Sequence, residues 1–182
     1  LISAAQIGYR EPDFDQNTKE ANFRAMHKEY EKARAIAPNG VIGFNIMVAM
    51  NGYEDYVKTA IETGADIIVS GAGLPTSLPK LADKSEIKLA PIVSTAKSAK
   101  VILKYWQKKY QRMPDLLVIE GPCAGGHLGF AKEQLDAYFP EQPDLPKASY
   151  DTQVKEILSI AKEYEDICQC KIPTALAGGI EN

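Results

Sequence analysis

Residues 116–130 read Leu-Leu-Val-Ile-Glu-Gly-Pro-Cys-Ala-Gly-Gly-His-Leu-Gly-Phe, an apolar run that leads directly into a glycine-rich loop. The apolar run, 116–119, predicts a buried strand. Four glycines within residues 121–129 then surround His127. Glycine is costly in chain entropy, so such a cluster indicates positive φ angles or backbone that approaches another group closely. Because α/β proteins place ligands at the carboxyl ends of buried strands, this loop predicts a ligand site that contains a proton-exchanging side chain.

The rest of the chain alternates short apolar runs with amphipathic segments. We expect strands at 1–5, 41–48, 66–70, 89–94, 116–119 and 172–177. We expect helices at 17–37, 54–63, 78–83, 96–110 and 151–165. Apolar strands that are separated by helices indicate a parallel sheet covered on both faces.

Polar or glycine-rich residues follow several strand ends in turn, namely 71–73, 94–95, 120–129 and 178–179. A doubly wound sheet uses one crevice, whereas a TIM-type (β/α)8 barrel gathers residues from many strand ends. The pattern therefore favours an α/β barrel, which we expect to occupy residues 1–182 as one domain.

Composition narrows the classes of function. The chain has 182 residues, 45% of them hydrophobic and 25% charged, with a formal net charge of −3. That balance, with dispersed Lys and Arg, argues against a nucleic-acid surface, and no apolar stretch is long enough to predict a membrane span. The three cysteines, which show no zinc-ligand spacing, predict free thiols in a reducing cytoplasm and no metal site.

Several residues are candidates for ligand contact, and each has a plain structural alternative. Asn45 lies inside an apolar strand, where it either satisfies the core or contacts a polar ring edge of a cofactor. Gly71 begins a Gly-Ala-Gly turn that would let a flat ligand lie against backbone. Glu120 either anchors the glycine-rich loop or touches a ligand. The glycine pair Gly178 and Gly179 suits either a tight turn or a phosphate site built from backbone N–H groups.

These pieces, in this order, resemble the nitronate monooxygenase family, formerly called 2-nitropropane dioxygenases, and its relatives, the FMN-dependent enoyl-acyl-carrier-protein reductases. The matching motifs are the strand motif 43–45, the Gly-Ala-Gly loop 71–75, the histidine loop 120–129 and the Ala-Gly-Gly-Ile loop 177–180. The resemblance implies a β/α barrel that holds FMN noncovalently. It implies that His127 is catalytic and that Gly178 and Gly179 bind the FMN phosphate.

The resemblance also implies that a further set of residues lies near the flavin, namely Asn45, Gly71, Ser94, Glu120, Ala124, Gly125 and Gly126. The family's first strand, with its Gly-Gly-Met loop, and its last strand, with its Gly-Thr pair, have no counterpart here, so the barrel is expected to be truncated. Residues 132–150 form an insertion that could serve as a lid or substrate entrance.

The function implied by the resemblance is FMN-dependent oxidation of alkyl nitronates by O2 to a carbonyl compound and nitrite. An NAD(P)H-using enoyl-ACP reductase acting on an enoyl thioester is the nearest alternative. A flavin-free phosphate-binding barrel lyase or isomerase and a noncatalytic flavin-binding domain represent other classes. The substrates would be small molecules, and a homodimer is left open.

Overall fold

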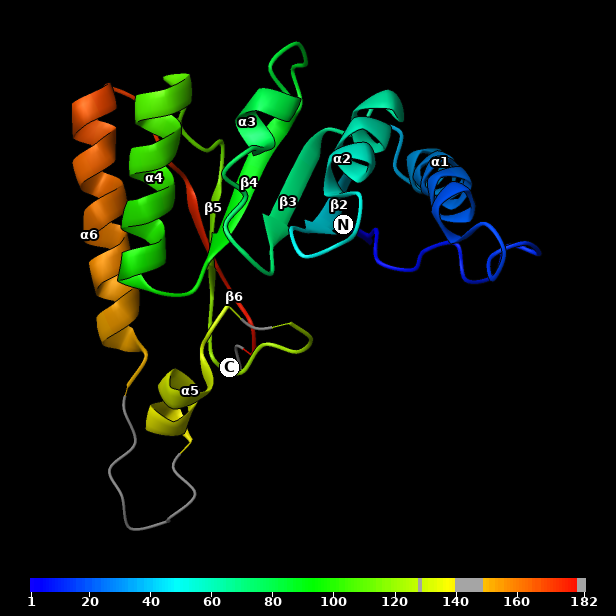
Figure 1. Ribbon diagram of the computed structural model, residues 1–182. Coiled ribbons are helices and arrows are strands. Elements are labelled where there is room, and N and C mark those ends of the chain that lie inside the picture. The colour runs from blue at the N-terminus through cyan, green and yellow to red at the C-terminus, as the bar shows by residue number, and fades with distance from the viewer. Residues whose placement is uncertain (128, 140–148, 180–182) are drawn as a thin grey trace. The chain divides into compact units, whose positions relative to one another are not determined.

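The computed structural model describes residues 1–127, 129–139 and 149–179 (Figure 1). Its strands are β1 (Ile2–Ser3), β2 (Gly43–Met47), β3 (Ile67–Gly71), β4 (Lys88–Val93), β5 (Leu117–Glu120) and β6 (Thr174–Ala177). Its helices are α1 (Thr18–Ile36), α2 (Tyr53–Glu62), α3 (Leu78–Leu81), α4 (Ala96–Tyr110), α5 (Lys132–Tyr138) and α6 (Asp151–Cys168). The strand order is β1-β2-β3-β4-β5-β6, and the pairings β1–β2, β2–β3, β4–β5 and β5–β6 are parallel. The predicted α/β class is confirmed.

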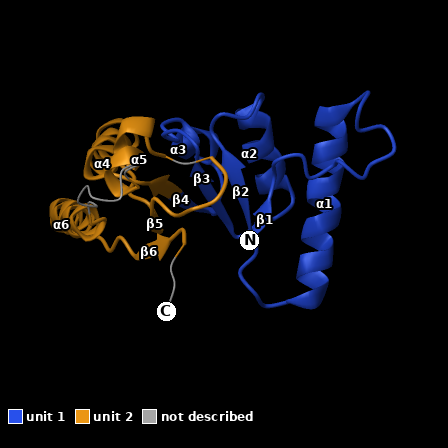
Figure 2. Ribbon diagram, turned by 90° about the horizontal axis from the view of Figure 1, so that it is seen from below, with its two compact units in different colours: residues 1–90 blue, residues 91–182 orange. Residues whose placement is uncertain are grey.

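Two compact units make up the chain, residues 1–90 and 91–182 (Figure 2). The single-domain assignment for residues 1–182 stays a prediction. None of the described helices is both long enough and apolar enough to span a bilayer.

In the first unit, β2 forms a continuous parallel ladder with β3, from Gly43 opposite Ile67 to Met47 opposite Gly71. The core side chains Phe44, Ile46 and Ile68 have no exposed surface. Burial of these large apolar groups supplies the main stabilising force of the unit.

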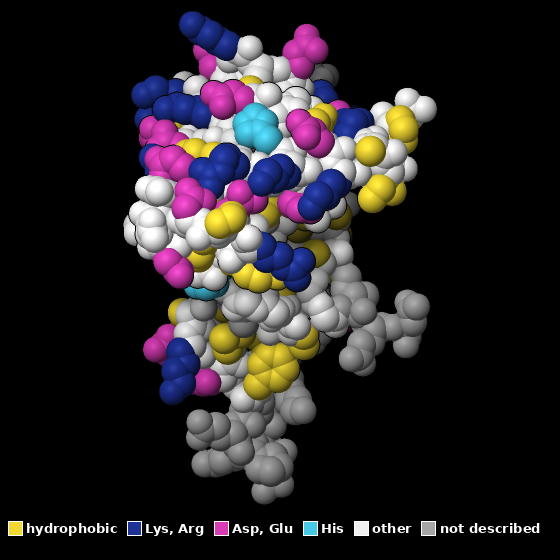
Figure 3. All heavy atoms as spheres, turned by 90° about the vertical axis from the view of Figure 1, so that its right-hand side faces the viewer, with side chains coloured by type: hydrophobic (Ala, Val, Ile, Leu, Met, Phe, Trp, Pro, Cys, Tyr) yellow, Lys and Arg dark blue, Asp and Glu magenta, His cyan; other side chains and the backbone are white. Residues whose placement is uncertain are grey.

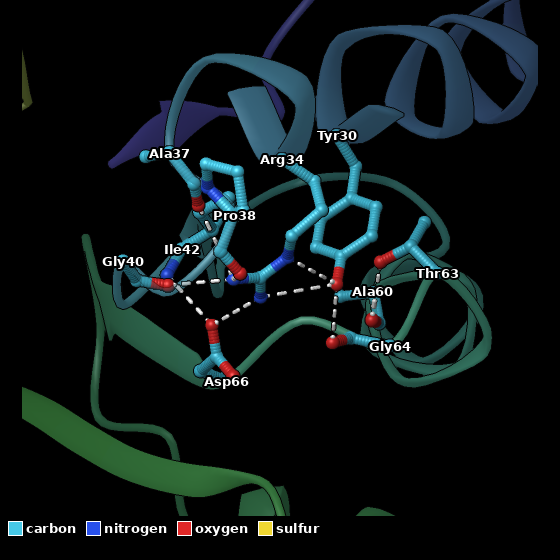
Figure 4. Close-up of polar contacts among 10 residues, drawn as sticks. All are labelled: Tyr30, Arg34, Ala37, Pro38, Gly40, Ile42, Ala60, Thr63, Gly64 and Asp66. Atoms are coloured by element: carbon cyan, nitrogen blue, oxygen red, sulfur yellow. Dashed lines mark hydrogen bonds and ion pairs between the residues drawn. The ribbon is translucent and has the colours of Figure 1, made fainter. Parts of the chain in front are cut away.

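A polar cluster joins the end of α1 to the amino-terminal side of β2 and β3 (Figure 4). Arg34 donates hydrogen bonds to the carbonyl of Gly40 at 2.7 Å and to the carboxylate of Asp66 at 2.7 Å. The same Asp66 oxygen accepts a bond from the backbone N–H of Ile42 at 2.7 Å. That backbone bond, followed by the Arg34 guanidinium, lowers the pKa of Asp66. Arg34 also donates to the carbonyl of Ala37, the C-cap residue of α1, so the cluster supplies a donor at the end of the helix.

The face on which α1 lies carries charges of both signs, interspersed (Figure 3). Exposed ion pairs on this side include Lys19 with Asp55, Lys28 with Glu11, and Lys32 with Glu29. Exposed pairs of this kind contribute little to stability, so we regard this face as solvated surface. His27 is exposed on α1, as its charged helical surroundings predict.

In the second unit, α4 and α6 pack side by side (Figure 1, Figure 2). Trp106, Leu117, Ile119 and Ile157 are almost completely buried between these helices and the strands of the unit. The side-chain amide oxygen of Gln153 on α6 accepts a bond from the backbone N–H of Ala96 at 3.0 Å. This bond satisfies a free donor at the start of α4 and docks the beginning of α6 against it.

The predicted insertion, residues 132–150, was expected only as a possible lid, and the structure shows that it begins with a helix, α5. Residues 140–148 of the insertion lie outside the described residues. A lid function for this segment stays a prediction.

Candidate functional site

The last residue of β5 holds the far end of the glycine-rich loop. One carboxylate oxygen of Glu120 accepts hydrogen bonds from the backbone N–H of Gly129 at 3.0 Å and from the hydroxyl of Ser94 at 3.2 Å. Ser94 is only 3% exposed. A Cβ on residue 129 would lie 2.3 Å from the Ser94 hydroxyl oxygen, which explains why a glycine stands there. Among the described residues, Glu120 therefore acts as the loop anchor, and its proposed flavin contact stays a prediction.

A tyrosine that the sequence reasoning missed bridges two strand ends beneath this loop. The Tyr150 hydroxyl lies 2.7 Å from the carbonyl oxygen of Ser94 and 2.8 Å from that of Glu120. Burial, with smaller effects from Tyr138 and Glu120, raises the pKa of Tyr150, so the hydroxyl stays a donor at neutral pH. The only signal in the sequence was an aromatic residue directly before a predicted helix.

Three aromatic rings gather next to the same loop. Phe130 and Tyr138 lie edge to face with their centroids 6.0 Å apart, and each lies 5.8 Å from the ring of Tyr150. Edge-to-face pairs at these distances are favourable beyond simple burial of area. We name Phe130, Tyr138 and Tyr150 the aromatic cluster. It connects the end of the loop to α5 and to the start of α6.

The two glycine-rich loops contact each other through backbone. The N–H of Gly121 donates to the carbonyl of Ala177 at 2.8 Å. A Cβ on Gly178 would lie 2.7 Å from the Cβ of Ala124, and one on Gly179 would lie 2.3 Å from the Cβ of Cys123. Both glycines also have positive φ angles, 92° and 68°. Glycine is therefore required at 178 and 179 by the positive φ angles and by the close approach of the other loop, independently of any ligand.

Gly125 and Gly126 differ from that pair because they face open space. Among the described residues, nothing lies within 4 Å of a Cβ built on either one. Gly126 has a positive φ of 84°, but Gly125 does not, so neither its conformation nor a described neighbour explains the glycine at 125. The N–H groups of Gly125, Gly126, Gly178 and Gly179 donate to no described residue. Free N–H groups on adjoining loops suit an anionic or flat ligand that approaches the backbone.

His127 lies between the open glycines and the anchored end of the loop. Its side chain is exposed and hydrogen-bonds to no described residue. Cys123 is likewise an exposed free thiol, and no described hydrogen bond joins it to His127. The imidazole is thus free to contact a bound molecule. Leu128 and Ile180, which belong to the two predicted motifs, lie outside the described residues.

Two predicted contacts, Asn45 and Gly71, belong to the first unit. Asn45 is half-buried on β2, and its side-chain amide bonds to no described residue. Among the described residues, every fully buried side-chain polar atom has a partner, so the amide of Asn45 is not fully buried. Its contact with a cofactor ring stays a prediction. Gly71 ends β3 and accepts a bond from Val48 N–H at 2.8 Å. The next residue, Ala72, has a φ of 51°, which is strained for a residue with a Cβ.

The described residues contain no group of His, Cys, Asp or Glu suited to hold a metal ion. In the described part of the second unit, the N–H groups of Gly125, Gly126, Gly178 and Gly179 form a backbone cradle beside the exposed imidazole of His127. Such a cradle suits an organic cofactor that carries phosphate better than it suits a metal.

Three comparisons with known proteins bear on the family and the fold of the chain. The family model for nitronate monooxygenase matches residues 14–182. A search of curated proteins found no match. Among solved structures, the chain is similar to FabK from Thermotoga maritima (22% identity, TM-score 0.60) and to a point mutant of that protein (22% identity, TM-score 0.59). Each match covers 87% of this chain but only 40% and 42% of the other chain, so this chain spans about two fifths of their length. The likeness confirms the predicted barrel-type α/β fold.

Proposed function

We propose that this chain, which belongs to the nitronate monooxygenase family, contributes the catalytic histidine and part of the cofactor site of an FMN-dependent oxidoreductase that oxidises alkyl nitronates with O2 to carbonyl compounds and nitrite. One observation carries the proposal most directly. The exposed His127 stands on a loop that is held at both ends. The far end is bonded to Glu120 through the N–H of Gly129, and the near end is bonded through the N–H of Gly121 to the carbonyl of Ala177, directly before Gly178. A free imidazole on a held loop suits a reaction that develops or binds negative charge.

The glycines of the second unit fit the cofactor that the family implies. The free N–H groups of Gly178 and Gly179 would hold the FMN phosphate, since backbone donors at a strand end bind phosphate well. The open faces of Gly125 and Gly126 would let the ring system lie against backbone without meeting a Cβ. Ala124 lies against Gly178 and would line the same cradle. The cofactor, when bound, supplies the electron transfer that none of these side chains can perform.

The part of His127 follows from the charge of the substrate. A nitronate is an anion whose negative charge lies on the nitro oxygens. An imidazole N–H directed at those oxygens would orient the substrate and stabilise its charge. Asn45 and Gly71 belong to the first unit, and their contact with the cofactor stays a prediction from the family resemblance. Ser94 would act through Glu120, because its hydroxyl already bonds to that carboxylate.

The remaining parts of the proposal concern partners and location. The substrates would be small molecules together with O2, and the protein would act in a reducing cytoplasm without binding nucleic acid. The predicted homodimer would be tested by measuring the mass of the complete protein in solution.

The test compares two histidine variants of the complete protein. His127→Ala should lower kcat with a nitronate by about 100- to 1000-fold, the usual effect of removing one charge-stabilising donor. FMN should stay bound, as measured by its visible spectrum after gel filtration. His27→Ala, on the exposed face of α1, is the matched control and should behave as wild type. Equal turnover by the two variants would refute the assignment of His127.

A second assay separates nitronate oxidation from enoyl reduction. The wild-type protein is given a nitronate with O2 in one reaction, and an enoyl thioester with NADH or NADPH in another. Nitrite release in the first and no nicotinamide oxidation in the second are expected. The reverse result would assign the protein to enoyl reduction, with His127 at the same site.

A further inference from the structure

We propose that Tyr150 is a positioning residue for the loop that carries His127. Its hydroxyl joins the two strand ends that support the loop, and its ring packs against the residue that follows the loop. The proposal rests on the proposed function, because it gives Tyr150 a part in the same reaction.

The Tyr150 hydroxyl forms its hydrogen bonds just beyond the point where the pairing of β4 with β5 ends. The pairing of β4 with β5 ends at Val93 opposite Ile119. The next residues along the two strands are Ser94 and Glu120, and the Tyr150 hydroxyl lies within 2.8 Å of both of their carbonyl oxygens. A tyrosine hydroxyl has one hydrogen, which these carbonyls share. Tyr150 thus continues the connection between the strands by one residue beyond the ladder.

That connection reaches the loop through the side chain of Glu120. With its carbonyl held by Tyr150, the Glu120 backbone directs its carboxylate toward Ser94 and Gly129. The bond from Gly129 then sets the end of the loop, two residues after His127. A small rotation at Glu120 would therefore move the imidazole.

The ring of Tyr150 contacts the residue that follows the loop. Phe130 directly follows Gly129 and lies edge to face with the Tyr150 ring, at 5.8 Å between centroids. Tyr150 itself directly precedes α6, whose Gln153 is bonded to the start of α4. The hydroxyl and ring are therefore presented from a docked helix, which gives the loop a rigid support.

The experiment uses Tyr150→Phe in the complete protein, because phenylalanine keeps the ring and removes only the hydroxyl. Tyr105→Phe on α4, whose hydroxyl accepts a bond from exposed Lys109, is the matched control. The measurements are kcat and KM with the substrate that the wild type turns over, FMN retention, and amide hydrogen exchange of peptides covering residues 121–130. Hydrogen exchange is read whether or not the protein shows activity.

We expect Tyr150→Phe to lower kcat about tenfold with KM changed less than about twofold, since a displaced catalytic group costs turnover more than binding. FMN should be retained, and exchange should rise in residues 121–130 while peptides of α4 and α6 stay protected. Unchanged exchange in the loop together with wild-type kcat would overturn the proposal. Faster exchange throughout residues 91–179 would also overturn it, because Tyr150 would then serve general stability.

The two proposals can fail separately. If the wild type is inactive with both nitronates and enoyl thioesters, the proposed function fails. A rise in exchange confined to residues 121–130 in Tyr150→Phe would still support the positioning role in that case.

Discussion

Glu120 and Gly129 close the histidine loop on itself: the carboxylate of the last residue of β5 accepts the backbone N–H of Gly129 at 3.0 Å. The loop therefore leaves the sheet at Glu120, and its other end is bonded to the side chain of that residue. A loop closed in this way has fewer conformations than one held at a single end. This closure lets a segment with several glycines present His127 at a defined place.

The close approach of Ser94 to Gly129 leads to the first prediction. In Gly129→Ala the new Cβ would lie 2.3 Å from the Ser94 hydroxyl oxygen, so the loop or Ser94 must shift. We expect a loss of about 1–3 kcal/mol in the free energy of unfolding, the usual cost of overpacking. The measurement is urea denaturation monitored by circular dichroism.

A double-mutant cycle tests the cause of that loss. Ser94→Ala removes the closest atom, although its own Cβ remains 3.2 Å from the added one. The cost of Gly129→Ala should therefore be smaller in the Ser94→Ala background than in the wild type. Equal costs in both backgrounds would show that Ser94 is not what excludes a side chain at residue 129.

The second prediction contrasts two glycines of the proposed cofactor cradle. Gly179→Ala should lower the free energy of unfolding by about 2 kcal/mol or more, because of its positive φ and its contact with Cys123. Gly125→Ala should leave that free energy unchanged or raise it by up to about 1 kcal/mol, since no described atom opposes its Cβ. Denaturation of the FMN-free protein measures both effects.

Cofactor affinity then separates packing from binding at these two positions. Both variants should bind FMN more weakly than wild type, as followed by quenching of flavin fluorescence. Gly125→Ala is the decisive variant, because its fold is expected to be intact. Wild-type FMN affinity in Gly125→Ala would mean that the open face of Gly125 does not meet the cofactor.

The third prediction concerns the polar cluster around Asp66. Its pKa is lowered from 3.8 by the bond from Ile42 and by Arg34, so the carboxylate favours the folded state when ionised. The stabilisation should be complete above about pH 4, near the pKa of an unfolded aspartate. It should be lost as the pH falls through the lower pKa of the folded state.

The variant Asp66→Asn isolates this effect. Its free energy of unfolding should be lower than that of wild type at pH 7, by about 1 kcal/mol given the partial exposure of the pair. The difference should shrink as acid protonates Asp66. Asp136, an exposed residue of α5, provides a matched control as Asp136→Asn, which should leave the free energy of unfolding at pH 7 close to that of wild type. A difference between Asp66→Asn and wild type that stays constant down to pH 2 would contradict the assignment.

Much of the fold could be predicted from the order of residues along the chain. The helix expected at 96–110 was found at Ala96–Tyr110, and the strands expected at 66–70 and 89–94 were found within one residue of those limits. These elements carry their signals locally, in apolar periodicity and in caps such as Thr95, whose hydroxyl accepts the N–H of Ser98 at 3.1 Å. The short helix α5 was missed because it buries none of its residues.

The sequence by itself determined the alternation of strands and helices, the parallel class and the glycine loops at strand ends, because periodicity and the conformational needs of glycine are properties of neighbouring residues. It also singled out His127 through the residues on either side of it. Only the tertiary structure showed that Glu120 anchors the loop through Gly129, and that Tyr150 joins Ser94 to Glu120. Those contacts link residues up to 56 positions apart, and no local pattern specifies which distant side chain will fill a given gap.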